Sequence, residues 1–524
     1  MIKRLIPWVL VACLALATLS GCTIPNLDED FEDDLSQHYN LKMVMPFNTG
    51  TSLPNDLEMV LEEVNKITLR EINATLTVIP YIYSEYYSKS GLMVNAAEKF
   101  DLMHTSAANY FLNVEMKALY PLETLLKKYA PETWAMFDTQ IWDQMRYGEG
   151  NKIYGAINNQ ILPRAGELWA YNEDYFEDFM TEEGYNENSF SQMTLTQRFD
   201  VIEQYAEYLS DNNLGKGEDN KAQMYGIEMT HFIEGLASFD HLAQGAGVPG
   251  VVRSTDTLED GKLEVINQFT SPEFLEYIDR LASWYNKGYI PEDSSRIDGA
   301  TTLDLYTGPT WKPGNRKEYK QFGQTKYQKS YQFNEFYYQQ AYLLGTMWSV
   351  SATSDNPGRA VRMIELLHTN AEINDLFKLG IMGTHYTLEE VTENGVTGYL
   401  AKNISNAYFN DDSRWVTGNE FLGTPLITQS LDVWEQTQRI NDEAIIPDVI
   451  GFVFDRNPVL TEIQLCQNVY LTYANRMAYA RELVTYTGSY DSLYDEFISA
   501  MNAVGANKVI AEKQRQLDAW LASK

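Results

Sequence analysis

The spacing of hydrophobic and polar residues changes from strand-like to helix-like and back at the start of the folded part. Residues 41–47 (LKMVMPF) form an apolar run that predicts a strand. From Leu57 to Ile67 apolar residues recur every three or four positions, which predicts one buried face of a helix. Further strands are predicted at 75–82 and 100–105. Strands that alternate with helices predict a mostly parallel sheet covered by helices.

Open sheets of this kind bind ligands at the carboxyl ends of their strands. Those ends fall at 48–51, at 81–83 and at 106–110, where hydroxyl, amide and tyrosine side chains follow the apolar runs. We expect these three segments to meet at one edge of the sheet.

Helix signals return later in the chain. Ser271 followed by Pro272 is typical of a helix start, and Gly288 of its end. Asn356-Pro357 predicts a second start. Residues 304–338 between them are rich in Tyr, Lys, Gln and Gly with little periodicity, so we expect loop or short strands there.

The N-terminus reads as a lipoprotein export signal. Lys3 and Arg4 precede an apolar run, and Leu19-Ser20-Gly21-Cys22 has the small-residue pattern of a cleavage site. This predicts a signal peptide at 1–21 and lipidation of Cys22, with the protein anchored in the cell membrane and facing the extracellular side or the periplasm. The apolar run is shorter than the roughly 20 residues that span a bilayer. A plain secretory signal and a membrane helix are the alternatives.

The formal net charge of −33 argues against nucleic acid or anionic lipid headgroups as partners. Acidic residues crowd behind Cys22, so residues 22–38 are predicted to form an extended acidic linker. Of three cysteines only Cys466 lies beyond the signal and anchor, which excludes an internal disulfide, and its apolar surroundings predict a buried, inert thiol. The length of 524 residues predicts two or three domains.

The chemistry suggested by the composition is binding, with no catalytic residues expected. Common hydrolase, nucleotide-binding and metal motifs are absent from the sequence, and six scattered histidines lack ligand spacing, so neither metal nor cofactor is expected. The 35 Tyr and 10 Trp can stack on sugar rings where they lie beside amides and hydroxyls. On this basis the predicted ligand-binding residues are Asn48, Thr49, Tyr81, Ser106, Tyr110, Asn158, Asn159, Trp169, Tyr306, Trp311 and Trp415.

Several segments, in this order along the chain, resemble one family. They are 151–159, 166–175, 343–367, 414–421 (RWVTGNEF), 451–455 (GFVFD) and 512–521. Together they resemble the extracellular solute-binding lipoproteins of carbohydrate ABC importers, family 1, and most closely the LplA-like subgroup, whose C-terminal domain was formerly of unknown function. Residues 301–314 keep the Lys-Pro-Gly of that family but otherwise depart from its pattern.

The resemblance implies an α/β, two-lobed periplasmic-binding-protein-like fold of type II, with mixed sheets flanked by helices and a multi-strand hinge. Lobe 1 would comprise 39–155 and about 340–375. Lobe 2 would comprise 156–339 and about 376–524 with a C-terminal helical extension.

The function implied by the resemblance is capture of a carbohydrate, in the first place an oligosaccharide, and delivery to the permease subunits of an ABC transporter by a monomeric protein. A lipid-anchored glycoside hydrolase or lyase, and a binding protein for a peptide or polyamine, are the alternatives.

Overall fold

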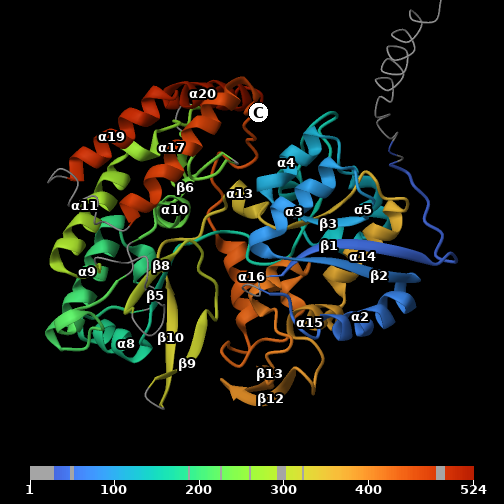
Figure 1. Ribbon diagram of the computed structural model, residues 1–524, viewed down its shortest axis with the longest axis horizontal. Helices are drawn as coiled ribbons and strands as arrows, with labels where there is room; N and C mark the ends of the chain where they lie inside the picture. The colour runs from blue at the N-terminus through green and yellow to red at the C-terminus, as the bar shows by residue number, and fades with distance from the viewer. Residues whose placement is uncertain are drawn as a thin grey trace, which may run out of the picture.

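The computed structural model describes residues 27, 29–47, 52–186, 189–224, 227–242, 244–258, 261–291, 303–321, 324–478 and 490–524. Two α/β lobes lie side by side, each with its own sheet (Figure 1). The predicted two-lobed fold is confirmed. The predicted signal peptide and Cys22 lie outside the described residues.

Lobe 1 is built on a five-stranded mixed sheet of order β2-β1-β3-β11-β4. β1 is parallel to both β2 and β3, and β11 is antiparallel to β3 and β4. The predicted strand-helix-strand unit is confirmed, because apolar residues of β1 and α2 bury against each other in one core. The bounds are β1 Tyr39–Phe47, α2 Leu57–Ile72, β2 Ala74–Ile82, β3 Leu102–Thr105, β4 Ala156–Ile157 and β11 Met347–Val350.

Helices cover this sheet, and α14 begins as its sequence predicts. The Asn356 side chain accepts a hydrogen bond from the backbone N–H of Arg359 at 2.8 Å, with Pro357 in the first turn. The elements around the sheet are α3 Tyr83–Asn95, α4 Ala107–Glu115, α5 Glu123–Tyr129, α6 Pro131–Ala135, α7 Thr139–Asp143, α13 Gln340–Leu343, α14 Pro357–Thr369, α15 Ala371–Leu379, the hairpin β12 Tyr386–Glu393 and β13 Val396–Asn403, and α16 Val433–Glu443.

Lobe 2 carries a four-stranded sheet of order β8-β5-β10-β9. The predicted caps of α11 are confirmed: Ser271 accepts a hydrogen bond from Phe274 N–H at 3.2 Å, and Gly288 ends the helix with φ of 82°. The elements are β5 Glu167–Ala170, α8 Glu173–Glu182, α9 Leu195–Asp211, α10 Met229–His231, β6 Phe239–Asp240, β7 Val252–Arg253, α11 Pro272–Lys287, β8 Leu305–Gly308, β9 Arg316–Gln321, β10 Gln324–Gln332, α17 Leu460–Ala478, α19 Tyr490–Ala503 and α20 Ala506–Leu521.

Residues 304–338 contain more strand than expected, because β9 and β10 form a long hairpin. Several Lys, Gln and Tyr side chains of β10 are only half-buried, so the strand lacks a strong apolar stripe. Period-two patterning is therefore weak in this part of the sequence.

Three chain segments cross between the lobes and pair with one another. Tyr337 pairs antiparallel with Arg164 and parallel with Ile445. The Arg164 N–H donates to the Tyr337 carbonyl at 2.8 Å, and the Ile445 N–H donates to the Phe336 carbonyl at 2.9 Å. The predicted multi-strand hinge is thus present in the structure.

The lobe boundary differs from the expected one after residue 375. Phe377, Tyr408 and Val416 are fully buried in the same core as the lobe 1 sheet, so this segment packs on lobe 1 and not on lobe 2 as predicted. The chain returns to lobe 2 only after α16, with α17, α19 and α20 (Figure 1). Sequence patterning shows that these residues are buried but not which core receives them.

The predicted extended linker at 22–38 is corrected at its C-terminal end. The Asp33 carboxylate is fully buried and pairs with Arg359 and Arg362, both at 2.9 Å. Arg359 is itself fully buried, and a buried guanidinium needs a carboxylate partner. The acidic run therefore includes a residue that anchors the N-terminal segment to lobe 1.

Cys466 is fully buried, as predicted, and burial raises the pKa of its thiol to about 11. In the part of the chain that the structure describes, no helix is long and apolar enough to cross a membrane.

Candidate ligand-binding cleft

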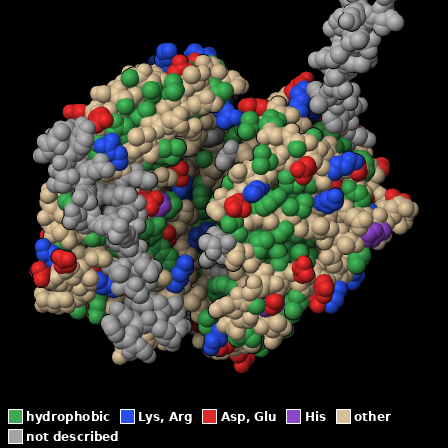
Figure 2. All heavy atoms as spheres, in the orientation of Figure 1, with side chains coloured by type: hydrophobic (Ala, Val, Ile, Leu, Met, Phe, Trp, Pro, Cys, Tyr) green, Lys and Arg blue, Asp and Glu red, His purple; other side chains and the backbone are tan. Residues whose placement is uncertain are grey.

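A cavity of about 960 Å³ lies between the lobes, with the lobe 2 sheet on one side and residues 401–429 of lobe 1 on the other. Figure 2 shows the hollow between the two halves of the molecule. The lobe 2 wall consists of Glu167, Trp169, Tyr171, Tyr306, Thr310, Lys312, Gly314, Asn315, Arg316, Lys317 and Gln328. The lobe 1 wall consists of Ala401, Lys402, Asn403, Phe409, Arg414, Trp415 and Leu426–Gln429.

Strand alternation explains how lobe 2 presents its wall. Successive side chains of a strand point to opposite faces of a sheet. On β5, Leu168 is buried in the lobe 2 core, whereas Glu167 and Trp169 face the cavity. Tyr306 of β8 stands directly opposite Trp169 in the antiparallel register and shares its face. One face of the sheet therefore stabilises the lobe, and the other offers aromatic rings to a ligand.

Glu167 is a buried carboxyl in this wall, only 9% exposed. Burial raises its pKa to about 7, against the opposing effects of the Trp169 side chain, of an Asn315 hydrogen bond at 3.3 Å, and of the positive charge of Lys317. The carboxyl therefore changes its protonation state near neutral pH and can donate or accept a hydrogen bond from a ligand.

Trp415 is held in the lobe 1 wall by its neighbours on both sides. Its ring meets those of Tyr83 and His104 edge-on, with centroids 5.3 and 5.7 Å apart. Its backbone carbonyl accepts hydrogen bonds from the Asn158 side-chain amide and the Thr346 hydroxyl, both at 2.9 Å. The indole is therefore a rigid platform for stacking.

Glu420 links the two lobes beside the cavity. Its carboxylate, 3% exposed, pairs with Arg414 of lobe 1 at 2.6 Å and with Lys312 of lobe 2 at 3.5 Å. Burial acts to raise its pKa, but these positive charges outweigh burial and hold the pKa below its usual value. Next to it, the Glu420 N–H donates to the carbonyl of Asn159 in the hinge at 2.7 Å.

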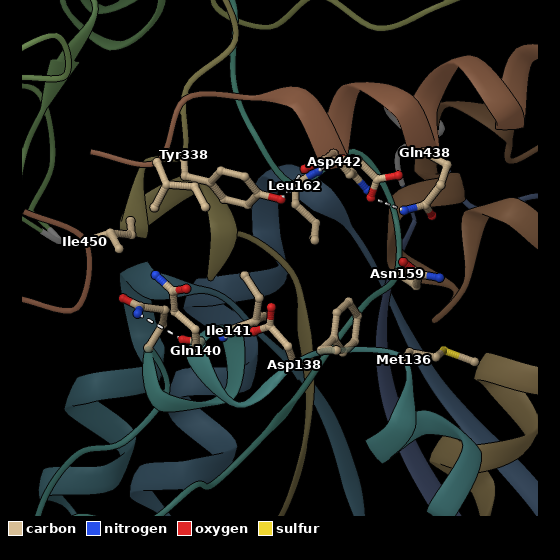
Figure 3. Close-up of a pocket in the computed structure, with 14 residues that line it drawn as sticks. Met136, Asp138, Gln140, Ile141, Asn159, Leu162, Tyr338, Gln438, Asp442 and Ile450 are labelled. Atoms are coloured by element: carbon tan, nitrogen blue, oxygen red, sulfur yellow. Dashed lines mark hydrogen bonds between the residues drawn. The ribbon is translucent and has the colours of Figure 1, made fainter. Parts of the chain in front are cut away.

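Of the predicted binding residues, Trp169, Tyr306 and Trp415 line this cavity. Trp311 lines an adjoining cavity of about 1190 Å³ and donates its indole N–H to the Ser330 carbonyl at 2.9 Å. Asn159 lines a third cavity, of about 370 Å³, at the hinge. Figure 3 shows Asn159 there, with Tyr338 and Asp442 on one side and Gln140 and Asp138 on the other.

Other predicted residues have structural roles. Asn158 is 1% exposed, and its amide donates to Thr346, Trp415 and Val416, so it braces the hinge and does not line the cavity. Tyr110 is fully buried in the lobe 1 core, where its hydroxyl donates to the Met145 carbonyl at 2.6 Å.

Ser106 is 7% exposed, and its N–H donates to the Asn109 side chain at the start of α4. The Tyr81 hydroxyl donates to the Met93 sulfur at 3.7 Å. Neither lines the cavity between the lobes. Asn48 and Thr49 lie outside the described residues.

Sequence reasoning missed the charged and amide side chains of the wall. A period-two pattern joins Glu167, Trp169 and Tyr171, and would have placed all three on one strand face. Asn315–Lys317 directly follow the Lys-Pro-Gly that the chain shares with the family, and that position could have indicated them. Arg414 could have been found because it precedes Trp415, which was predicted. Lys402 and Asn403 end a hairpin strand that carries no such signal.

Comparison with known proteins agrees with this architecture. Residues 448–522 match a family model described as a domain of unknown function, DUF3502. A carbohydrate ABC transporter substrate-binding protein of Streptococcus pneumoniae serotype 4 is 23% identical over 498 residues, which cover 90% of this chain and 89% of the relative.

Solved structures share the fold over nearly the whole chain. The N-glycan transport solute binding protein NgtS of Streptococcus pneumoniae is 18% identical, with a TM-score of 0.71 over 92% of this chain and 99% of that one. An extracellular solute-binding protein of Bifidobacterium longum subsp. infantis is 14% identical, with a TM-score of 0.57 over 93% and 99%. The chain therefore has the two-lobed solute-binding fold, and the resemblance to substrate-binding proteins of carbohydrate ABC transporters is confirmed.

Proposed function

We propose that this chain binds an oligosaccharide in the cavity between its lobes and delivers it to the permease of an ABC transporter. The observation that carries the proposal is the composition of the cavity wall. Trp169, Tyr171 and Tyr306 face Phe409 and Trp415 from the opposite lobe. Aromatic faces pack on the C–H faces of sugar rings, and rings on both sides can enclose a sugar chain.

Amides complete the sugar-binding character of the wall. Asn315 and Gln328 lie on the lobe 2 side, and Asn403 and Gln429 on the lobe 1 side. Each side-chain amide can both donate to and accept from a hydroxyl group. The volume of about 960 Å³ suits a ligand of several sugar rings.

The wall supports binding more than hydrolysis. Glycosidases of the common kinds use two carboxyl groups on opposite sides of the bond that breaks. Among the described residues that line the cavity, Glu167 is the only carboxylic acid. A polyamine site would need several acids, so the same observation disfavours that alternative.

Calorimetry with a panel of oligosaccharides tests the proposal. Trp169→Ala and Trp415→Ala should each weaken binding by roughly 1–3 kcal/mol, the scale of losing one well-packed aromatic contact. Trp520→Ala is the matched control, because Trp520 packs on Phe452 in the C-terminal helical part and does not line the cavity. Unchanged affinity in both variants would show that the sugar does not bind against Trp169 and Trp415 in this cavity. Release of sugar products would favour a hydrolase.

The location of the protein is also part of the proposal. A lipid on Cys22 would keep a monomeric protein at the membrane surface near its permease. Support comes from the small-residue pattern before Cys22 and from Lys3 and Arg4. Cys22→Ala should move the protein from the membrane fraction to the medium or leave its signal uncleaved, and wild-type fractionation of the variant would contradict the anchor.

A further inference from the structure

The described residues that line the cavity between the lobes include more cations than acids, unlike the chain as a whole. The protein has 73 acidic and 40 basic residues, and a formal net charge of −33. The described wall nevertheless contains one acid, Glu167, and five cations. These cations are Lys312, Arg316, Lys317, Lys402 and Arg414.

Several of these cations pair with acids that lie beside the cavity. Glu420 serves both Lys312 and Arg414. Arg316 pairs with Glu173 at 2.8 Å, and Lys402 pairs with Glu389 at 2.6 Å. Among the described residues that line the cavity, cations outnumber acids by five to one, and Lys317 is an exposed member of the set. A cleft of one sign focuses its field on a charged ligand.

Lys317 is the best placed of these cations. Its ammonium group lies 5.8 Å from the centre of the Trp169 ring, and no carboxylate of a described residue forms an ion pair with it. Because this ammonium lies over the Trp169 ring, a ligand that reaches Trp169 meets a cation at the same place. From the other lobe, Lys402 and Arg414 adjoin Asn403 and Trp415, so cations accompany the aromatic and amide groups on both sides.

The hydroxyl groups of a neutral sugar can accept hydrogen bonds from these cations, but they compensate the lost hydration less well than an anionic group does. When the lobes close, charged groups in the cavity lose part of their hydration, which is costly unless an opposite charge replaces it. A carboxylate or sulfate on the ligand would supply that charge and form charge-assisted hydrogen bonds with Lys and Arg.

We propose that the ligand is an anionic oligosaccharide, bearing carboxylate or sulfate groups, and that Lys317 and Lys402 bind those groups from opposite lobes. This inference rests on the proposed oligosaccharide function of the same cavity. It adds the ligand's charge and the residues that recognise it.

Calorimetry with matched ligands tests the charge. Galacturonate oligosaccharides are compared with galactose oligosaccharides of equal length, and sulfated chondroitin oligosaccharides with their desulfated forms. We expect the acidic member of at least one pair to bind more tightly, and its affinity to fall as salt concentration rises. The pair that responds identifies the anionic group.

Variants then test the residues. Lys317→Gln and Lys402→Gln should each weaken binding of the acidic member roughly tenfold, the scale of one charged hydrogen bond, and leave any binding of the neutral member unchanged. Lys326→Gln is the control, since Lys326 lies on the same hairpin as Lys317 but does not line the cavity.

The outcomes separate the two proposals. If neutral oligosaccharides bind as tightly as acidic ones, or if neutral sugars bind most tightly on a wider glycan array, the proposal of an anionic ligand is wrong and the oligosaccharide function stands. If no glycan on the array binds, the proposed function falls with it.

Discussion

Glu167 gives the sharpest prediction for stability. Its pKa is about 7 in the folded protein, against 4.5 for a solvated glutamate, because burial penalises the charged form. At pH 8 the carboxyl is ionised in both states, and only the folded state bears the cost of burying the charge. At 1.36 kcal/mol per pH unit, this difference destabilises the fold by about 3 kcal/mol at most.

The sign of the pH effect follows from proton binding. Between pH 4.5 and 7 the folded state binds more protons at this site than the unfolded state, so the free energy of unfolding falls as pH rises. Glu167→Gln removes the charge and keeps the shape. We expect the variant to exceed wild type by up to about 3 kcal/mol at pH 8 and by about 1 kcal/mol at pH 5.

Urea unfolding of both proteins across this pH range, followed by tryptophan fluorescence, measures the effect. Glu173→Gln is the control, because Glu173 is similarly buried but pairs with Arg316, and its loss should give no gain in stability. A Glu167→Gln protein that is no more stable than wild type at pH 8, or whose advantage is the same at pH 5, would refute the reasoning.

Three further predictions concern ion pairs and motion. Glu420→Gln leaves Arg414 and Lys312 without their shared carboxylate, and urea unfolding should show a loss of about 3–5 kcal/mol; a loss below about 1 kcal/mol would mean that water solvates both cations. Asp33→Ala leaves the fully buried Arg359 uncompensated and should cost a similar amount in the same assay, whereas Asp34→Ala, at an exposed position, should cost little. Small-angle scattering should show a smaller radius of gyration with saturating ligand, because closure on a hinge compacts the whole molecule; an unchanged radius would contradict closure.

The lobe 1 sheet could be predicted from sequence because its signals are local. Apolar runs and the helical face from Leu57 fix each element, and the order of elements implies the parallel pairing of β1 with β2 and β3. The caps of α11 and α14 are equally local, since Ser271 and Asn356 act on N–H groups three residues away.

The rest depends on contacts that no local pattern records. Phe377 and Cys466 are both fully buried, yet they belong to different lobes, and their own sequence neighbourhoods do not distinguish the two cores. Trp169 and Trp415 were predicted to bind ligand, and the structure brings them to one cavity from positions 246 residues apart (415 − 169). Asn158 is the opposite case. It was predicted to bind ligand, but its side-chain amide donates to the backbone carbonyls of Trp415 and Val416.

The pairing of Asp33 with Arg359 has a consequence for how the molecule would move at a membrane. If Cys22 carries lipid, ten residues lie between the anchor and Asp33, and two of them, Leu27 and Phe31, already pack on the lobe 1 core. The chain from Cys22 to Leu27 therefore reaches roughly 18 Å at most. Because this N-terminal segment is attached to lobe 1, that lobe would stay close to the bilayer. The lobes would then open and close mainly by rotation of lobe 2, together with its C-terminal helices, relative to a nearly fixed lobe 1.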